Sequence, residues 1–300
     1  MKIVSHRFRG FGEFENSPDA FNNALEQGVC AFEFDVRVTK DNALLINHDP
    51  FIKLDAKNKV NLTKINSIEL YKARGINSNT PLPSYLSELL DLFVSKGKEK
   101  SLIFIDVKDF GAEKEIYQLL AERKLIKSTV IVSWLPEVLF AFHKIDKNLP
   151  LCFSHNYIRS NFQYTIVKFL LGNDSFKKKL ALLIKPFSTK LADALPEIKF
   201  YFEDYNSRES SPGRQSCNCS DFEHTLNGPV TGKLMEIIEE SKGYLCIQYR
   251  LIDRNYLSLY KSSPSIIPYS INSETEIEKF IKQIKPDYIL SDNPALVSKF

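Results

Sequence analysis

Short apolar runs alternate with amphipathic segments along most of this 300-residue chain. Apolar runs and period-two alternation bounded by turn residues are typical of strands, whereas spacings of three and four residues are typical of helices. Strands are expected near residues 2–5, 31–37, 102–107, 129–134, 150–154, 245–249, 266–271 and 287–291, with residues 43–47 as an accessory strand. Helical stretches, such as 112–122 and 274–284, lie between most of them. Eight strand–helix units predict an α/β fold, a closed TIM (β/α)8 barrel.

The segment from Ala31 to Val38 places carboxylates within a strand that is otherwise apolar. Because strand side chains alternate between two faces, Glu33, Asp35 and Arg37 share one face. Taken alone, a Glu-x-Asp pair more often belongs to a solvated face. The alternative is a site for a hard divalent cation, whose charge would relieve the repulsion between the two carboxylates.

Further titratable residues lie at the exits of other expected strands. His6 follows the first strand, His48 follows the accessory strand, and Asp106 and Lys108 end the third. Each histidine by itself is more often a structural residue. Because the carboxyl ends of barrel strands meet at one face, where TIM-barrel enzymes carry their reacting groups, the joint pattern predicts a metal site beside an acid–base pair.

Four ordered motifs resemble those of the glycerophosphodiester phosphodiesterase family. The family's His-Arg-Gly, Pro-Glu-Asn-Thr, Glu-x-Asp-Val-x-x-Thr-Lys-Asp and His-Asp stretches correspond to residues 6–8, 13–17, 33–41 and 47–50. Its Pro-Thr-Leu-Glu-Glu-x-Leu, Trp-Thr-Val-Asn and Thr-Asp-x-Pro elements resemble segments within residues 82–90, 267–272 and 287–294. The similarity covers about residues 1–154 and 244–300.

The resemblance implies a metal-dependent phosphodiesterase that hydrolyses glycerophosphodiesters to sn-glycerol 3-phosphate and an alcohol. His6 and His48 would be its catalytic pair, and we assign His6 as base and His48 as acid, although the sequence does not order them. The implied ligands of a divalent metal ion, Mg²⁺ or Ca²⁺, are Glu33, Asp35 and Asp106. The implied substrate-binding residues are Arg7, Lys108 and Asn16.

Two positions depart from the family pattern. Phe8 stands where the family has the glycine of His-Arg-Gly, so we expect this loop to be reshaped. Asp106 stands where the family usually has a glutamate two residues before a lysine. An Asp-x-Lys at this point also resembles the sphingomyelinase D relatives, which share the barrel, whereas the His-Arg and Glu-Asn segments favour the glycerophosphodiesterases.

Two other functions stay open at this point. The first is a lysophospholipase D or sphingomyelinase D-like lipid phosphodiesterase that acts at membranes. The second, of a different class, is a non-catalytic barrel that binds phosphate esters. The paired histidines argue against the second, because a binding protein does not need both an acid and a base.

An insertion at about residues 155–243 is far longer than an ordinary loop between strands. We expect it to be largely helical and to lie between the fifth and sixth strands. Its first part, residues 155–190, has seven basic side chains and one acidic side chain, a net charge of +6 against +3 for the whole chain. The ordinary interpretation is a lid with a solvated basic face, and the alternative is a helix that contacts anionic lipid at the membrane surface.

Composition is that of a single globular domain over residues 1–300, with 43% hydrophobic and 26% charged residues. The first strand begins at the first residues, and no apolar stretch is long enough to span a bilayer. Five scattered cysteines indicate reduced thiols, which favours a cytoplasmic protein, with a peripheral membrane location as the alternative. The near-balanced charge argues against nucleic acid as a partner, so a small-molecule glycerophosphodiester or lysophospholipid is the expected substrate.

Overall fold

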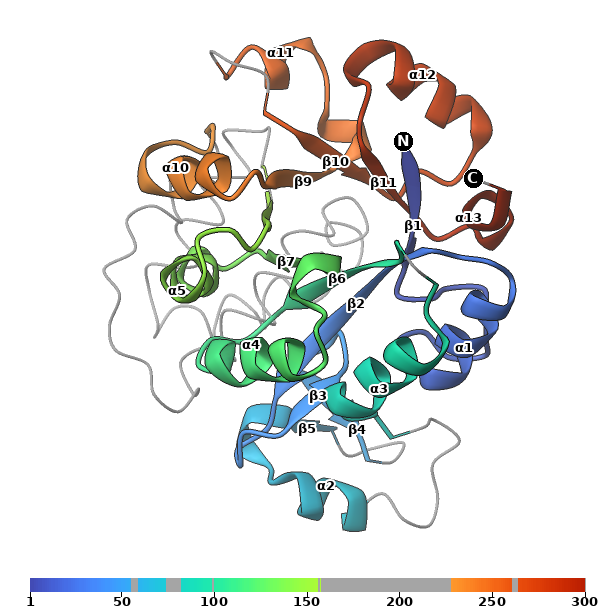
Figure 1. Ribbon diagram of the computed structural model, residues 1–300, viewed down its shortest axis with the longest axis vertical. Helices are drawn as coiled ribbons and strands as arrows, with labels where there is room; N and C mark the ends of the chain where they lie inside the picture. Colours follow the sequence, from blue (N-terminus) through green and yellow to red (C-terminus); the bar gives the residue numbers. More distant parts are fainter. Residues whose placement is uncertain are drawn as a thin grey trace, which may run out of the picture.

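The computed structural model describes residues 1–54, 59–73, 82–98, 100–155, 157, 228–260 and 264–299. Eight parallel strands form a nearly closed barrel, which confirms the predicted TIM-barrel class (Figure 1). These strands are β1 (Lys2–His6), β2 (Ala31–Val38), β6 (Leu102–Val107), β7 (Thr129–Ser133), β8 (Leu151–Ser154), β9 (Tyr244–Gln248), β10 (Ile266–Tyr269) and β11 (Tyr288–Ser291). The accessory strand predicted at residues 43–47 is present as β3 (Leu44–Ile46), which pairs antiparallel with β2.

The strands follow one another around the ring in chain order, and β11 pairs with β1 in parallel register. The last gap lies between β10 and β11, which are in contact. There the backbone N–H of Ile271 donates to the carbonyl of Leu290 at 3.3 Å. The first and last segments of the chain therefore lie side by side, although almost the whole sequence separates them.

Helices surround the barrel and cover the outer faces of its strands (Figure 1). They are α1 (Pro18–Glu26), α2 (Ser67–Ala73), α3 (Leu86–Lys96), α4 (Glu113–Glu122), α5 (Pro136–Ile145), α10 (Gly232–Glu240), α11 (Arg254–Leu257), α12 (Glu274–Ile284) and α13 (Pro294–Lys299). Within the described ranges, the 3₁₀ turns are η1 (Leu62–Lys64), η2 (Ile126–Ser128) and η3 (Tyr249–Leu251). Helix α1 begins at Pro18 because the Ser17 hydroxyl accepts from the N–H of Ala20 at 3.2 Å, and because the N–H that Pro18 lacks would have no partner at the first helical position.

A small hairpin unit follows β3. It consists of β4 (Phe51–Lys53) paired with β5 (Lys59–Asn61), then η1 and α2. Its apolar side chains form a cluster of their own around Leu45, Ile52 and Leu62. This unit therefore has an apolar cluster that is separate from the main core and includes Leu45 of β3.

Strand alternation divides the core into two layers. Outward-facing side chains such as Phe32 and Phe34 pack under the helices, whereas a second cluster that includes Val4, Phe104 and Leu290 fills the barrel interior. The interior is thus a packed core and not a channel. At the carboxyl ends of the strands this apolar filling gives way to polar side chains.

Most of the predicted insertion, residues 158–227, lies outside the described residues, as do the basic side chains counted within 155–190. Its predicted helical character and its lid or membrane role therefore stay predictions. Helix α10 is described and packs on β8 and α5. In the described ranges, no helix combines the length and the apolar composition that crossing a bilayer requires.

The loop after β1 contains Phe8 at the position where the family has glycine. Its backbone has φ of 57°, a left-handed conformation that favours glycine, yet its ring is fully buried. The ring packs against Phe21, Phe32 and Phe34 with centroids 5.0 to 6.2 Å away. The burial of this aromatic surface offsets a backbone strain of about 1–2 kcal/mol.

We predict that Phe8→Ala lowers the free energy of unfolding by about 3–5 kcal/mol, because it removes a buried ring. Phe8→Gly should be less destabilising than Phe8→Ala, although glycine normally costs more, because only glycine is unstrained at this φ. Urea unfolding of the two variants measures the difference. An alanine variant more stable than the glycine variant would show that the backbone strain is unimportant here.

Candidate active site

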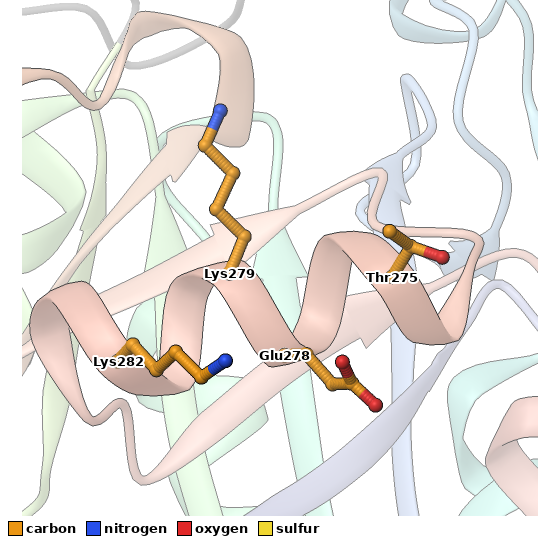
Figure 2. A pocket seen from close by; sticks show the side chains of 4 residues that line it. All are labelled: Thr275, Glu278, Lys279 and Lys282. Carbon is orange, nitrogen blue, oxygen red and sulfur yellow. The ribbon is translucent and has the colours of Figure 1, made fainter.

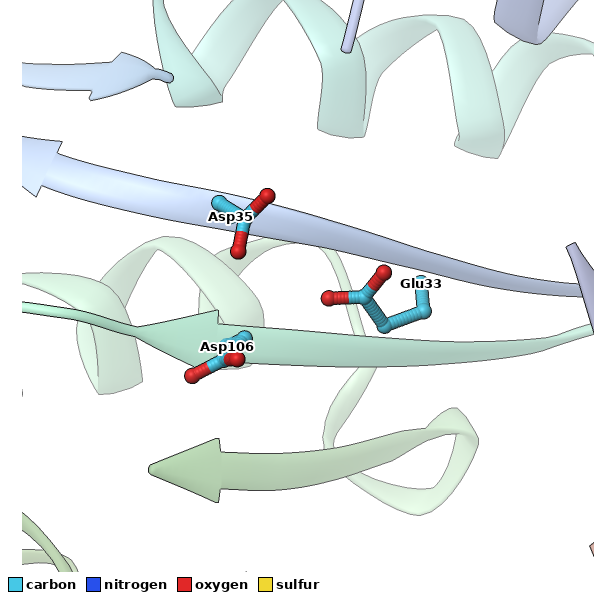
Figure 3. A group of neighbouring side chains, drawn as sticks. All are labelled: Glu33, Asp35 and Asp106. Carbon is cyan, nitrogen blue, oxygen red and sulfur yellow. The ribbon is translucent and has the colours of Figure 1, made fainter. Parts of the chain in front are cut away.

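Three carboxylates from two neighbouring strands converge inside the barrel at its carboxyl end. Asp35 of β2 lies beside Asp106 of β6 in the parallel register, and Glu33 lies two residues earlier on the same face of β2. All three are buried, and one oxygen from each lies within 4.8 Å of the others (Figure 3). The predicted metal-ligand set is therefore brought together by the fold.

The electrostatics of this group leave negative charge to be compensated. Burial, together with the charges of Asp35 and Asp106, raises the pKa of Glu33 well above its ordinary value. Burial also acts to raise the pKa of Asp35, but the positive charges of Arg7 and Lys108 outweigh it and hold that pKa well below its usual range. A divalent cation beside Glu33 would supply the missing positive charge.

The donor set fits such an ion. Asp106 Oδ1 is buried and has no hydrogen-bond partner among the described residues, so an inward-facing lone pair is available there. Carboxylate oxygens are the ligands that Mg²⁺ and Ca²⁺ prefer. Among the described residues, no other group of His, Cys, Asp and Glu side chains has this arrangement.

Two basic side chains border the carboxylates and contact Asp35 from different directions. Arg7 Nε lies 3.0 Å from Asp35 Oδ2, and Lys108 Nζ lies 3.0 Å from Asp35 Oδ1 and also pairs with Asp106. Burial opposes their charge, but the surrounding carboxylates raise the pKa of both groups, so both stay positive. Because Lys108 contacts two of the three candidate ligands, its ammonium and a metal ion would compete for the same oxygens.

Asn16, predicted to bind substrate, is buried against Asp35. Its Nδ2 donates to Asp35 Oδ2 at 2.9 Å, and its Oδ1 accepts from the backbone N–H of Asp35 at 3.4 Å. The Asn16 backbone has φ of 53°, a conformation that asparagine tolerates better than most residues. These contacts set the orientation of the Asp35 carboxylate.

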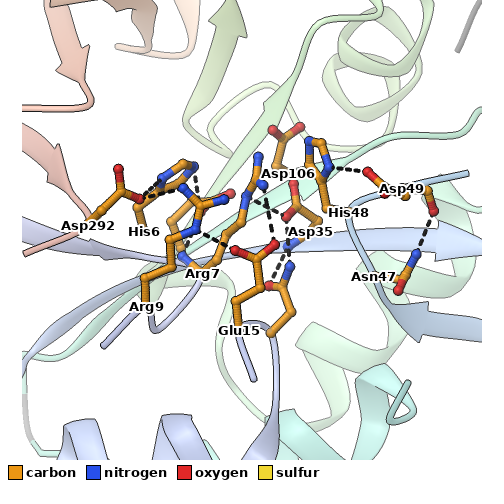
Figure 4. Close-up of polar contacts among 12 residues, drawn as sticks. His6, Arg7, Arg9, Glu15, Asp35, Asn47, His48, Asp49, Asp106 and Asp292 are labelled. Atoms are coloured by element: carbon orange, nitrogen blue, oxygen red, sulfur yellow. Dashed lines mark hydrogen bonds and ion pairs between the residues drawn. The ribbon is translucent and has the colours of Figure 1, made fainter. Parts of the chain in front are cut away.

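His6 extends from the end of β1 into the same site (Figure 4). Its Nδ1 lies 2.7 Å from Asp292 Oδ1, and its Nε2 lies 3.7 Å from Glu33 Oε2. Burial acts to raise the pKa of Asp292, but His6 and Arg9 outweigh it and lower that pKa. Asp292 is therefore an acceptor at neutral pH, which makes Nδ1 of His6 the donor and leaves Nε2 with a lone pair.

The pKa of His6 itself is lowered, first by burial and then by the charge of Arg7, while Asp292 acts in the opposite direction. The ring is consequently neutral at pH 7 and can accept a proton on Nε2.

His48 approaches the carboxylates from the turn that follows β3. The N–H of Asn47 donates to the carbonyl of Asp35 at 3.1 Å, and His48 Nδ1 lies 2.8 Å from Asp49 Oδ1. The charge of His48 contributes, after those of Arg7 and Lys108, to the lowered pKa of Asp35, which places its ring within electrostatic range of the triad. His6 thus approaches Glu33, whereas His48 acts electrostatically on Asp35, so the two predicted catalytic histidines approach different members of one triad.

Several residues of this network were not predicted as site residues. Asp292 follows β11, and its role as the partner of His6 depends on the closure of the barrel. Arg9 pairs with Asp292 at 2.9 Å and with Glu15, and Glu15 also lies 3.5 Å from Arg7. The sequence held a signal for Asp292, because this residue follows the last expected strand within the segment that resembles the family's Thr-Asp-x-Pro element, but nothing in the sequence indicated that its partner is His6.

A separate hollow lies on the outer face of α12 (Figure 2). It is lined by Thr275, Glu278, Lys279 and Lys282, which all belong to this one helix. None of the polar residues described above lines it.

The fold and the site define a class. This is a (β/α)8 barrel with a buried acidic triad, two histidines and two basic residues at the carboxyl ends of its strands, where barrel enzymes carry their active sites. Residues 4–159 match the model of the glycerophosphoryl diester phosphodiesterase family, and the chain belongs to that family. Phosphodiesterases of this kind are phosphoric diester hydrolases.

Relatives agree with this assignment. The chain is 25% identical over 167 residues to the lysophospholipase D GDPD1 of Mus musculus, covering 50% of this chain and 51% of that protein. It is 22% identical over 168 residues to glycerophosphodiester phosphodiesterase 1 of Bos taurus, covering 52% and 49%. The chain therefore aligns with about half the length of these curated relatives.

Solved structures share the fold. A glycerophosphodiester phosphodiesterase structure from Thermotoga maritima matches with a TM-score of 0.58 and 16% identity, over 99% of this chain and 96% of that one. A phosphodiesterase of Oleispira antarctica, solved in complex with the product sn-glycerol-3-phosphate, matches with a TM-score of 0.59 and 14% identity, over 100% and 96%.

We predict that Asp106→Asn weakens the binding of Mg²⁺ or Ca²⁺ by at least about tenfold, because it removes one of three charged donors. Lys108→Met should not weaken that binding, since it removes a competing positive charge. Isothermal titration calorimetry of the wild type and both variants measures the affinities. Equal affinities for the wild type and Asp106→Asn would exclude Asp106 as a ligand.

We also predict that Asp292→Asn lowers the pKa of His6 further, because it removes the carboxylate that raises it. NMR titration of the histidine ring protons in chelator-treated protein measures this shift. Asp49→Asn is the matched control and should leave the His6 titration unchanged. A His6 pKa that rises in Asp292→Asn would contradict the assigned hydrogen bond.

Proposed function

We propose that this protein is a metal-dependent glycerophosphodiester phosphodiesterase that releases sn-glycerol 3-phosphate and an alcohol. The observation that carries the proposal is the convergence of His6 and His48 on one buried triad of carboxylates. Membership of the phosphodiesterase family supports it. So does the structural likeness to the Oleispira antarctica phosphodiesterase, which was solved with sn-glycerol-3-phosphate bound.

Glu33, Asp35 and Asp106 would hold a divalent cation, Mg²⁺ or Ca²⁺. When bound, such an ion supplies charge neutralisation for a phosphoryl oxygen and lowers the pKa of a coordinated hydroxyl or water. The protein contributes the arrangement of the three oxygens, and Asn16 orients the carboxylate of Asp35 through its hydrogen bonds.

Arg7 and Lys108 would bind the remaining phosphoryl oxygens. Arg7 offers a planar fork of N–H donors, and Lys108 offers a compact positive charge. Both stay charged within the carboxylate cluster, so together they favour an anionic diester over a neutral ester.

The two histidines would divide the proton transfers. His6, neutral and with its Nδ1 held by Asp292, accepts on Nε2 the proton of the attacking oxygen. The attacking oxygen, that of a water molecule, forms a bond to phosphorus as the bond between phosphorus and the oxygen of the alcohol breaks, and His48 in its protonated form donates a proton to that leaving oxygen. The free alcohol and the phosphate monoester then depart, and proton exchange with solvent restores both rings.

A second candidate is a lysophospholipase D activity on lipid substrates. The mouse relative is a lysophospholipase D, which favours this activity. The excess of basic side chains in the sequence of residues 155–190 also favours it. The same catalytic groups would act, and the difference would lie in the substrate's acyl chain and its contact with the insertion.

We expect the wild type to hydrolyse glycerophosphocholine in the presence of Mg²⁺ or Ca²⁺, and a chelator to abolish this activity. His48→Ala should lower kcat/KM by about 10²–10⁴-fold, because the leaving alcohol loses its proton donor. A headgroup panel from glycerophosphocholine to lysophosphatidylcholine, with free choline or alcohol as the readout, measures both effects.

His143→Ala is the matched control, since His143 pairs with Glu240 on the outer helices at 2.9 Å. Turnover that survives both the chelator and His48→Ala would remove the proposed mechanism. Turnover of lysophosphatidylcholine well above that of glycerophosphocholine would favour the lipid substrate.

A further inference from the structure

The buried side chain of Arg37 connects the turn that carries His48 to the wall of the barrel. We propose that Arg37, fixed by Asp109, is a positioning residue that determines where the imidazole of His48 stands; this inference rests on the function proposed above. Arg37 belongs to β2, and Asp109 lies just beyond β6. Neither residue belongs to the predicted catalytic, metal or substrate set.

The guanidinium of Arg37 is held rigidly. Arg37 is 1% exposed, and its Nη1 donates to Asp109 Oδ1 at 2.9 Å. The second oxygen of Asp109 accepts from the backbone N–H of Val38 at 3.0 Å, so the carboxylate is itself tied to β2. Two neighbouring strands therefore fix the direction of the guanidinium.

From this position Arg37 Nε donates to the backbone carbonyl of His48 at 3.0 Å. A hydrogen bond from a charged donor is shorter and stronger than a neutral one, and it is strengthened further when it is buried. The His48 turn has other backbone anchors, from Asn47 to Asp35 at 3.1 Å and from Leu62 to Pro50 at 2.9 Å. Arg37 adds a charged side-chain donor at His48 itself.

The side-chain contact of His48 with Asp49 is a weaker restraint. The side chain of Asp49 is 64% exposed, so water competes for its hydrogen bond with the ring. Strand β3, from which the turn emerges, is only three residues long. Holding the backbone of the turn therefore restricts the position of the ring.

A purely structural role explains Arg37 less well. Placing a charge in the protein interior is costly, and apolar side chains of similar volume often stabilise a core more than a buried ion pair does. Apolar packing beside this turn is already provided by the cluster around Leu45, Ile52 and Leu62. What an apolar side chain cannot supply is a directed donor to the carbonyl of His48.

The test is a double-mutant cycle between Arg37→Lys and His48→Ala. Arg37→Lys keeps the positive charge but loses the planar fork, so we expect kcat to fall by about 10²-fold, a loss typical of a catalytic group displaced by about 1 Å, with KM little changed. The variant Arg37→Lys/His48→Ala should be no slower than His48→Ala. Multiplied losses would overturn the proposal, because they would show that Arg37 does not act through His48.

Two controls separate positioning from a general loss of structure. Arg123→Lys makes the same change in an ion pair with Asp91 on the outer helices, 2.7 Å apart, and should leave kcat unchanged. The affinity for Mg²⁺, measured by calorimetry, should stay within about threefold in Arg37→Lys, because this variant leaves the three candidate metal ligands unchanged. If Arg37→Lys does not fold, Asp109→Asn provides the test. It retains Arg37 but removes the carboxylate charge that holds the guanidinium, so it should reproduce the loss in kcat.

A second readout does not depend on activity. NMR of protein labelled at its five histidines should show the ring signals of His48, assigned with His48→Ala, shifted or broadened in Arg37→Lys and unchanged in Arg123→Lys. An inactive wild type whose His48 signals respond in this way would refute the proposed function and leave the positioning role intact. His48 signals that do not respond to Arg37→Lys would overturn the positioning role, whatever the activity.

Discussion

The site depends on the concentration of like charge inside the end of a barrel. Glu33, Asp35 and Asp106 are all buried, and burial alone would drive carboxylates toward their neutral forms. Arg7 and Lys108 outweigh the effect of burial at Asp35, whose pKa is lowered, but not at Glu33, whose pKa is raised. A cation near Glu33 would supply the positive charge that this carboxylate lacks.

Barrel closure gives the second essential contact. His6 ends the first strand and Asp292 follows the last, and the pairing of β1 with β11 places them 2.7 Å apart. The same closure brings Arg9 to Asp292 at 2.9 Å. A residue near the end of the chain therefore determines the tautomer of a histidine near its start.

The loop after β1 shows how a departure from the family pattern is tolerated. Phe8 adopts a left-handed backbone in place of the family's glycine, and its ring fills space among three other phenylalanines. Arg7, the residue before it, is left-handed as well, with φ of 55°. From that backbone Arg7 directs its own N–H to Glu33 and its guanidinium to Asp35. The buried ring of Phe8 thus stabilises the strained loop that presents Arg7 to the carboxylates.

The sequence by itself determined the barrel, and its resemblance to the phosphodiesterase family supplied the three candidate ligands. Hydrophobic alternation places strands and helices, and strand pleating puts Glu33 and Asp35 on one face, because these are local properties of the backbone. The partnerships of these residues were decided only by the tertiary structure. Asp292 with His6, Arg37 with Asp109, and Asn16 with Asp35 join positions 19 to 286 residues apart. No local pattern specifies such pairs, because they depend on the register of neighbouring strands and on how the ring closes.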